Sequence, residues 1–312
     1  MINVVYMGTA DIAAPVLERL AAASGVRVVG VVSQPDRPAG RNRVLTPSAV
    51  SEVAKRLGLP LLTPERIADP DSVAWLRSLV PDAAVVFAFG QFLPRSVREL
   101  PRLGSINIHP SRLPALRGAA PIPWAIANGE TSTAVSIIRM EKEMDAGDVL
   151  ACRDLDIDPD DTTASLGPRA ADLGADLVLE TLRAMAEGTV RATPQDASAA
   201  THARKLEKSD ARLDWTQPAS VLRNRIRAFD PWPGAVFNVA DAPADLIKVW
   251  RARVEEGSGA PGTILSIDRE GPLLACGRDA LRLLDVQAPG KRRMSAAEAA
   301  RGAGWCPGTV FG

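Results

Sequence analysis

Asn107 and His109 are two residues suited to acid–base and hydrogen-bond chemistry, and they lie two positions apart at the end of an apolar run. The run from Ser105 to His109 is typical of a β-strand, in which alternate side chains share a face. Pro110 favours extended backbone in the residue before it and has no N–H for a sheet, so the strand should end at His109. We therefore expect an amide and an imidazole to project together from a strand end. In an open α/β sheet, ligands bind beyond the carboxyl ends of the strands.

Asp145 adds a carboxylate to this pair, because its turn lies between two expected strands and can reach the same rim. Asn, His and Asp with no nucleophile beside them suit direct transfer of an acyl group to an amine. Asn107 and a protonated His109 would stabilise the oxyanion of the tetrahedral intermediate. Asp145 would raise the pKa of His109 and take the proton of the amine, directly or through water. The alternatives are a hydrogen-bonded polar pair at a turn and a carboxylate that caps its own backbone.

The composition is that of an ordinary globular protein, with 46% hydrophobic and 24% charged residues in a length of 312 that suggests two domains. The three cysteines are far apart and form no CxxC pair, which argues against disulfides and a zinc site and fits a reducing cytoplasm. The chain starts without a signal-peptide pattern, and no apolar run approaches the ~20 residues of a membrane helix. We therefore expect a cytoplasmic protein without a metal. Its net charge is zero, with a slightly acidic first part and a slightly basic second part.

Strand-like and helix-like patterns alternate through the first part of the chain, which predicts a parallel sheet with helices on both faces. The expected strands are residues 2–7, 26–32, 59–62, 83–89, 105–109, 135–140 and 149–152. One helix is expected directly after the first strand, with Thr9 or Asp11 as its cap. Further helices are expected over residues 48–57, 71–79 and 165–188, and a loop over residues 33–43. Gly8-Thr9 lacks the G-x-G-x-x-G pattern, so nicotinamide or flavin binding has no support.

A polar stretch that contains Pro194 predicts a linker over residues 190–204, between domains at residues 1–189 and 205–312. The second domain begins with a helix over residues 218–229. Short β-prone runs follow with the spacing of a small β-barrel, at residues 236–239, 247–254, 263–267, 273–276 and 281–286.

Several short motifs, in this order and spacing, resemble those of the 10-formyltetrahydrofolate-dependent formyltransferases. The family-wide ones are Asn107-Ile108-His109-Pro110-Ser111, Leu113-Pro114, Arg117-Gly118-Ala119-Ala120-Pro121 and Asp145-Ala146-Gly147-Asp148. Others resemble the members that act on tRNA: Gln34-Pro35-Asp36-Arg37-Pro38-Ala39-Gly40-Arg41, Arg227-Ala228-Phe229-Asp230-Pro231-Trp232-Pro233-Gly234, Pro261-Gly262-Thr263-Ile264-Leu265 and Gly290-Lys291-Arg292-Arg293-Met294.

The resemblance implies a Rossmann-like formyl-transfer domain followed by an OB-like open β-barrel. It implies 10-formyltetrahydrofolate as formyl donor and the α-amino group of methionine on initiator Met-tRNA as acceptor. By motif position, Asn107, His109 and Asp145 would be the catalytic trio. The folate pocket would be lined by Phe89, Gly90, Gln91, Phe92, Leu93, Ser111, Leu113 and Pro114. Pterins are flat and partly apolar, which suits such a set.

The resemblance also implies a tRNA-contacting loop over residues 36–43, with Arg37, Arg41 and Arg43, and with Arg41 as a key contact. Arginine can bond phosphates or base edges in pairs and stack on an unpaired base. In the second domain Arg223, Arg227 and Lys248 are expected either to track phosphates or to form a solvated face. We expect the protein to be a monomer.

The chain departs from the family pattern at a few positions. Arg112 replaces the usual Leu, and Glu141 and Glu143 stand where Asp and Gly are common, in the loop before Asp145. Three other functions stay open: a formyltransferase for an amino-sugar nucleotide, a formyltetrahydrofolate hydrolase that passes the formyl group to water, and a folate- or RNA-binding module without turnover.

Overall fold

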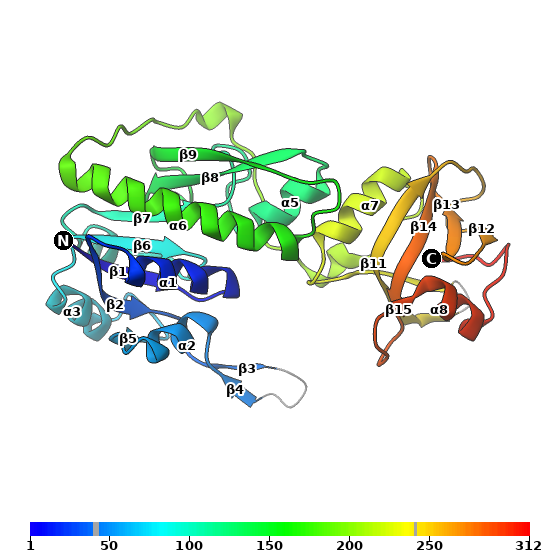
Figure 1. Ribbon diagram of the computed structural model, residues 1–312, viewed down its shortest axis with the longest axis horizontal. Helices are drawn as coiled ribbons and strands as arrows, with labels where there is room; N and C mark the ends of the chain where they lie inside the picture. Colours follow the sequence, from blue (N-terminus) through cyan, green and yellow to red (C-terminus); the bar gives the residue numbers. More distant parts are fainter. Residues whose placement is uncertain (40–43, 240–241) are drawn as a thin grey trace. The chain divides into compact units, whose positions relative to one another are not determined.

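The computed structural model describes residues 1–39, 44–239 and 242–312 (Figure 1). The chain forms two compact units, each made of three segments. Unit 1 contains Met1–Pro121, Ser132–Asp156 and Gly167–Ala203. Unit 2 contains Ile122–Thr131, Ile157–Leu166 and Arg204–Gly312. Two stretches from the middle of the chain thus belong with its C-terminal third.

In the part of the chain that the structure describes, unit 1 is built on a sheet of seven strands in the order β5-β2-β1-β6-β7-β8-β9 (Figure 1). The strands are β1 (Ile2–Gly8), β2 (Val26–Val32), β5 (Leu61–Leu62), β6 (Ala83–Phe87), β7 (Ser105–His109), β8 (Ser132–Arg139) and β9 (Val149–Asp156). The first five strands in this order are parallel, as predicted.

Strand β8 differs from the prediction, because it runs antiparallel to both β7 and β9. The connection from β8 to β9 spans only residues 140–148, and parallel neighbours need a crossover of about a dozen residues or more. The short connection therefore requires the antiparallel arrangement. It also carries Asp145, so the change in strand direction creates the turn in which the carboxylate lies.

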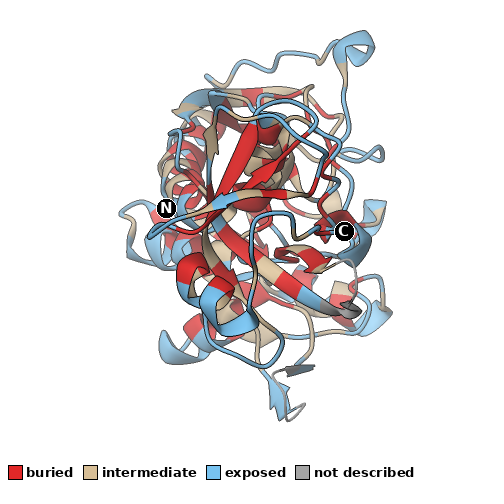
Figure 2. Ribbon diagram, turned by 90° about the vertical axis from the view of Figure 1, so that its right-hand side faces the viewer, coloured by how far each residue is buried: buried red, intermediate tan, exposed pale blue. Residues whose placement is uncertain are grey.

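Helices lie on both faces of this sheet, and they carry buried and exposed residues side by side, as the red and pale blue segments of Figure 2 show. On one face lie α1 (Ala14–Ala22) and α6 (Thr163–Glu187), which are joined by an ion pair of 2.6 Å between Arg19 and Asp176. On the other face, α3 (Pro70–Ser78) and α4 (Arg95–Arg98) contribute Leu76 and Val97 to an apolar core with residues of β1, β2 and β6. The helix predicted after residue 48 is α2 (Ala49–Arg56), and the Ser48 side chain caps it.

Two local expectations for this unit are wrong. Neither Thr9 nor Asp11 caps a helix; a short 3₁₀ helix η1 (Asp11–Ala13) precedes α1, and the Thr9 hydroxyl donates to the carbonyl of Phe89 instead. Residues 33–43 do not form only a loop, because β3 (Arg37–Ala39) pairs with β4 (Val44–Thr46). The turn-forming residues of this stretch conceal the hairpin in the sequence.

Unit 2 contains a curled antiparallel sheet in the order β10-β11-β14-β13-β12, with β15 paired to β14, as far as the described residues go. Its strands are β10 (Ala235–Val239), β11 (Ala242–Glu255), β12 (Ile264–Ile267), β13 (Pro272–Ala275), β14 (Ala280–Gln287) and β15 (Met294–Ser295). Its helices are α5 (Pro121–Ala127), η3 (Lys208–Ala211), α7 (Ala219–Ala228) and α8 (Ala296–Ala303), and η2 (Ala197–Ala199) belongs to unit 1.

The core of unit 2 is apolar and partly aromatic. Phe237 lies at the centre of the aromatic part, with ring contacts to Trp215, Trp305 and Phe311 at centroid distances of 4.6 to 6.2 Å. The five β-runs and the helix α7 were predicted from the sequence. The prediction had no element over residues 294–303, where the structure has β15 and α8; their alanine-rich sequence carries little apolar periodicity.

Candidate active site

Asn107, His109 and Asp145 lie together in unit 1, as the sequence predicts. The first two come from the carboxyl end of β7, and Asp145 comes from the turn between β8 and β9. The Asn107 amide donates to Asp145 Oδ1 at 3.4 Å, and His109 Nδ1 lies 3.6 Å from Oδ2. These contacts are long for hydrogen bonds, so the three side chains lie next to one another without short bonds between them.

The backbone conformation of the turn and a short bond from Gly118 hold the Asp145 carboxylate in place. Asp145 has a φ of 52°, a left-handed conformation that short polar side chains tolerate better than others do. The backbone N–H of Gly118 donates to Oδ2 at 2.9 Å. Gly147 passes so close to β8 that a Cβ would lie 1.9 Å from the carbonyl oxygen of Arg139, so only glycine fits there.

His109 is almost fully buried, with 3% of its surface exposed. Its Nε2 donates to the carbonyl of Leu116 at 2.9 Å. Because a carbonyl only accepts, the proton on Nε2 is present in every protonation state, and Nδ1, which faces Asp145, is the nitrogen that titrates.

Burial lowers the pKa of His109, although the nearby Asp145 carboxylate and the bond to Leu116 act in the opposite direction. Asp145 thus raises the pKa of His109 as expected, but the larger effect of burial makes the net shift favour the neutral ring and not the protonated one. Removing the charged imidazolium from water costs more free energy than its attraction to the carboxylate provides, so the neutral ring is favoured near neutral pH.

Arg117 and Gln195 add a second layer that supports this turn. Arg117 is 5% exposed and donates to the side-chain oxygen of Gln195 from two nitrogens, at 3.0 and 2.8 Å. The Gln195 amide in turn donates to the carbonyls of Asp145 and Gly147. Sequence reasoning gave neither residue a role. Arg117 begins one of the motifs quoted above, which could have marked it as a site residue. Gln195 lies in the polar stretch expected to be a linker, and nothing in the sequence there indicates a role.

The residues expected to line a folate pocket divide into two groups. The side chains of Phe89 and Leu93 are buried in the apolar core of unit 1, so they support the loop and are not free to contact a ligand. The Gln91 amide bonds the main chain at Pro64 and Ile67.

Phe92 and Gly90 complete this loop. Phe92 is 61% exposed and is the aromatic surface that the loop offers to a ligand. Gly90 has a φ of 82°, and a Cβ there would lie 2.4 Å from the Gln34 amide nitrogen, which donates to the carbonyl of Phe89. The loop path therefore depends on glycine at this position.

Ser111, Leu113 and Pro114 lie in the segment that follows His109. The Ser111 hydroxyl donates to the carbonyl of Ala115 at 2.6 Å, and Leu113 and Pro114 are joined by a cis peptide bond. Ser111 and Leu113 are buried. These residues shape the chain beside His109 and present few free polar side-chain atoms.

The residues expected to contact tRNA have different environments. Arg37 is exposed and pairs with Glu65 at 2.7 Å, whereas Arg41 and Arg43 lie outside the described residues. In unit 2, Arg223 pairs with Asp160 at 2.6 Å.

Arg227 and Lys248 are held by backbone carbonyls of unit 2. Arg227 is 9% exposed and donates to the carbonyl of Asp161, so its expected role on phosphates is corrected to a structural one. Lys248 is half-buried, donates to the carbonyl of Pro233 at 3.1 Å and lies 5.1 Å from the centre of the Trp250 ring.

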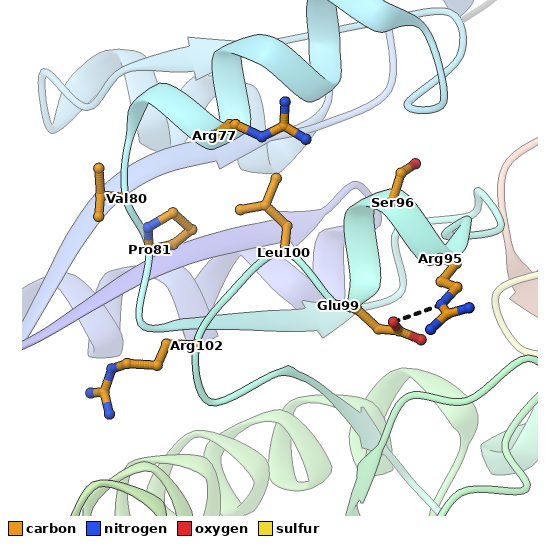
Figure 3. Close-up of a pocket in the computed structure, with 8 residues that line it drawn as sticks. All are labelled: Arg77, Val80, Pro81, Arg95, Ser96, Glu99, Leu100 and Arg102. Carbon is orange, nitrogen blue, oxygen red and sulfur yellow. Dashed lines mark hydrogen bonds and ion pairs between the residues drawn. The ribbon is translucent and has the colours of Figure 1, made fainter.

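A cavity of about 670 Å³ lies elsewhere in unit 1 (Figure 3). Arg77, Arg95 and Arg102 border it around Leu100. Arg95 pairs with Glu99 and Arg102 with Asp82. This cavity adjoins the start of β6, at the end of the sheet opposite to His109, and none of the expected site residues lines it.

The described residues contain neither a metal-ligand cluster nor a membrane-spanning helix. No three His, Cys, Asp or Glu side chains among them come together as metal ligands would. In the same part of the chain, no helix has both the length and the apolar character needed to cross a bilayer.

Comparison with known proteins identifies two family domains. Residues 2–182 match the model described as formyl transferase, and residues 205–304 match the one described as formyl transferase, C-terminal domain. A methionyl-tRNA formyltransferase of Geobacter metallireducens is 40% identical over 100% of this chain and 99% of its own. One of Roseiflexus castenholzii is 45% identical over 96% of each chain.

Solved structures share the fold. The crystal structure of WlaRD, a sugar 3N-formyl transferase in the presence of dTDP and 5-N-formyl-THF, has a TM-score of 0.66 at 15% identity. The alignment covers 94% of this chain and 99% of that one.

Proposed function

The chain belongs to the formyl transferase family, and we propose that it transfers the formyl group of 10-formyltetrahydrofolate to the α-amino group of methionine on initiator Met-tRNA. The observation that carries this proposal is the 40 to 45% identity, along nearly the whole chain, to curated methionyl-tRNA formyltransferases. The solved sugar formyltransferase matches at only 15% identity, so its likeness supports the fold and not a sugar acceptor.

The transfer moves one formyl group and one proton. The amine nitrogen attacks the formyl carbon, so a C–N bond forms and the carbonyl oxygen becomes an oxyanion. The bond between the formyl carbon and N10 of the folate then breaks. N10 takes up a proton, and the amine has lost one, so the balance closes without an external acid or base.

Asn107 is proposed to donate its amide hydrogen to the oxyanion. A donor of this kind acts where charge develops in the transition state, and losing one typically lowers the rate by about 10²–10³-fold. The proposal is supported by the position of its amide, which is 3.4 Å from Asp145 and is not held by a short bond.

His109 and Asp145 are proposed to carry the proton from the amine to N10. The titrating Nδ1 faces the carboxylate at 3.6 Å, so that a proton taken from the amine can be held between the two groups. The lowered pKa of His109 keeps this acceptor free before attack. The imidazolium or acid formed in this way then returns the proton to N10.

The folate donor is proposed to lie along residues 89–93 and 111–114. An exposed aromatic ring, Phe92, and backbone groups beside a buried core suit a flat, partly apolar pterin. The match of residues 2–182 to the formyl transferase family model also supports a formyl-carrying donor.

The tRNA is proposed to contact Arg37, Arg41 and Arg43 of the first unit and Arg223 and Lys248 of the second. Arg227 is not included, because its guanidinium is buried against carbonyls. An enzyme that acts on tRNA is expected in the cytoplasm, and we propose that it works as a monomer. Molar mass from light scattering tests the last point against the chain mass of 33.0 kDa.

The deciding experiment offers the purified protein 10-formyltetrahydrofolate with four acceptors in parallel: initiator Met-tRNA, elongator Met-tRNA, a dTDP-amino sugar and water alone. Formyl-Met-tRNA from the initiator, in excess over the elongator, is the expected result. Formate release without any formylated acceptor would reassign the protein as a hydrolase, and a formylated sugar would reassign it as a sugar formyltransferase. Binding of folate and tRNA without any product would reassign the protein as a binding module without turnover.

A further inference from the structure

Gln195 occupies a position from which it controls the turn that carries Asp145. We propose that Gln195 is a positioning residue, whose amide holds the Asp145 carboxylate opposite His109 with its own orientation fixed by Arg117. The catalytic consequence rests on the proposed function, but the placement of the carboxylate can be measured without it.

The amide bonds the turn on both sides of its central residue. Gln195 Nε2 donates to the carbonyl of Asp145 at 2.8 Å and to that of Gly147 at 2.7 Å. One side chain therefore satisfies two backbone acceptors that are two residues apart. Since Asp145 has a φ of 52°, these bonds also compensate a backbone conformation that a non-glycine residue rarely adopts.

Arg117 removes the ambiguity in the direction of this amide. A guanidinium only donates, so the atom of Gln195 that receives two bonds from Arg117 must be the oxygen. The NH₂ group is then left to face the carbonyls of Asp145 and Gly147. Arg117 is 5% exposed, and the bonds from its charged group to a half-buried amide are of the stronger kind.

The segment around Gln195 is anchored on both sides. Thr193 and Val149 of β9 exchange two backbone bonds of 2.9 Å. Further along, the carbonyl of Thr201 accepts from the backbone N–H of Arg117, and the Thr201 hydroxyl accepts from that of Leu116, both at 2.9 Å. The same segment thus also fixes Leu116, whose carbonyl receives the bond from His109.

Asp145 faces His109 Nδ1, and Arg117 lies behind Gln195 with Glu143 3.9 Å from its guanidinium. If the amide is lost, the carbonyls of Asp145 and Gly147 lose their donor, and the turn can relax away from the left-handed conformation. The Asp145 carboxylate then moves from His109, and the electrostatic coupling between the two groups falls.

The test measures this coupling by NMR, which is practical because the chain has only two histidines. The titration midpoint of His109 is followed in the intact protein and in Asp145→Asn, each with Gln195 present or replaced by Met. With Gln195 present, Asp145→Asn is expected to lower the midpoint, because the carboxylate favours the charged ring. In the Gln195→Met background, we expect the same change to move the midpoint little.

Steady-state kinetics on Met-tRNA supply a second readout. Gln195→Met is expected to lower kcat about 10- to 100-fold with little change in either KM, as a misplacement of the reacting groups does. Gln195→Glu keeps an acceptor for Arg117 but places oxygens against the two carbonyls, and it is expected to lower kcat to a similar extent. If Gln195→Met does not fold, Gln195→Glu replaces it in both measurements.

Asn238→Ala is the matched control. Asn238 is also an amide that receives a bond from an arginine, Arg212, and donates to a backbone carbonyl, that of Val239, but it lies in unit 2. It is expected to lower stability while leaving kcat and the His109–Asp145 coupling unchanged.

The outcomes separate the two proposals. Folded Gln195 variants with full kcat and an intact coupling overturn the positioning role. Failure of the unaltered protein to formylate Met-tRNA overturns the proposed function, whereas the NMR comparison still decides whether Gln195 places the carboxylate.

Discussion

At His109, burial and charge act in opposite directions on the same proton. Burial has the larger effect and lowers its pKa, and the Asp145 carboxylate only partly restores it. The lowered pKa favours a neutral ring at rest, and in the proposed reaction the ring becomes charged when a proton arrives from the substrate. A base that is free before attack and is stabilised once charged suits a reaction that moves one proton between two nitrogens.

The lowered pKa of His109 predicts how stability depends on pH. The unfolded chain protonates this histidine near its usual value of 6.5, and the folded chain does so only at lower pH. Its contribution is therefore complete above about 6.5 and is lost as pH falls below that value, with a slope of at most about 1.4 kcal/mol per pH unit. Urea denaturation between pH 7.5 and 5 measures this slope, and His109→Gln should reduce it. An unchanged slope in the variant would contradict the assignment.

Removal of the amide or the imidazole is predicted to affect turnover far more than binding. Asn107→Ala and His109→Ala should each lower kcat at least about 10²-fold, because both groups act mainly in the transition state. Folate affinity, measured by calorimetry, should change little. Weaker folate binding at unchanged kcat would show that the two residues hold the donor instead.

At the scale of elements, an ion-pair network joins the ends of β11 and β14 in unit 2. Arg282 is buried and bonds Glu255 at 2.9 Å, Asp268 at 3.0 Å and the carbonyl of Gly271 at 2.8 Å. Arg253 adds a bond to Glu255 at 2.8 Å. Hydrogen bonds from these arginines lower the pKa of Glu255 to about 2.

Glu255→Gln is predicted to destabilise the protein by about 1–3 kcal/mol, because a charged hydrogen bond to a buried arginine is lost while Asp268 remains. The Glu255 carboxylate contributes its stability above its usual pKa of 4.5, and this is lost as pH falls towards about 2. The variant should therefore show a smaller loss of stability over that acid range. Thermal melts at pH 7, 4.5 and 3 compare the two proteins, and parallel curves would contradict the role of Glu255.

The elements that carry the chemistry were predictable because their signals are local. An apolar run closed by Pro110 located β7, and residue spacing then placed Asn107 and His109 at its end. The antiparallel pairing of β8 with β9 was predictable, because the connection over residues 140–148 is too short for a parallel crossover, but residue patterns do not encode the direction of β8 relative to β7. The burial of Arg227 and the bonds of Gln195 also depend on contacts between segments far apart in the sequence.

At the scale of the whole molecule, the proposed tRNA contacts are distributed over both units, and phosphate contacts make affinity depend on salt. The affinity for initiator tRNA is predicted to fall steeply between 50 and 200 mM salt, as counterion release requires, whereas folate affinity should change much less. Filter binding over a salt series measures the slope. A combined Arg223→Gln and Lys248→Gln variant should have a shallower slope, and an unchanged slope would contradict contacts by these cations.

Each unit is built from three separate segments of the chain, and this limits how a domain of one such protein can be replaced by that of another. Trp124 and Thr163, which come from the two middle stretches of unit 2, bond the backbone at Arg204 and Ala228 in the same unit. A chimera with a single crossover near residue 204 would combine these residues with a foreign C-terminal third. Unit 2 is therefore not one continuous stretch of sequence, and transplanting it requires three segments and five coordinated junctions instead of one.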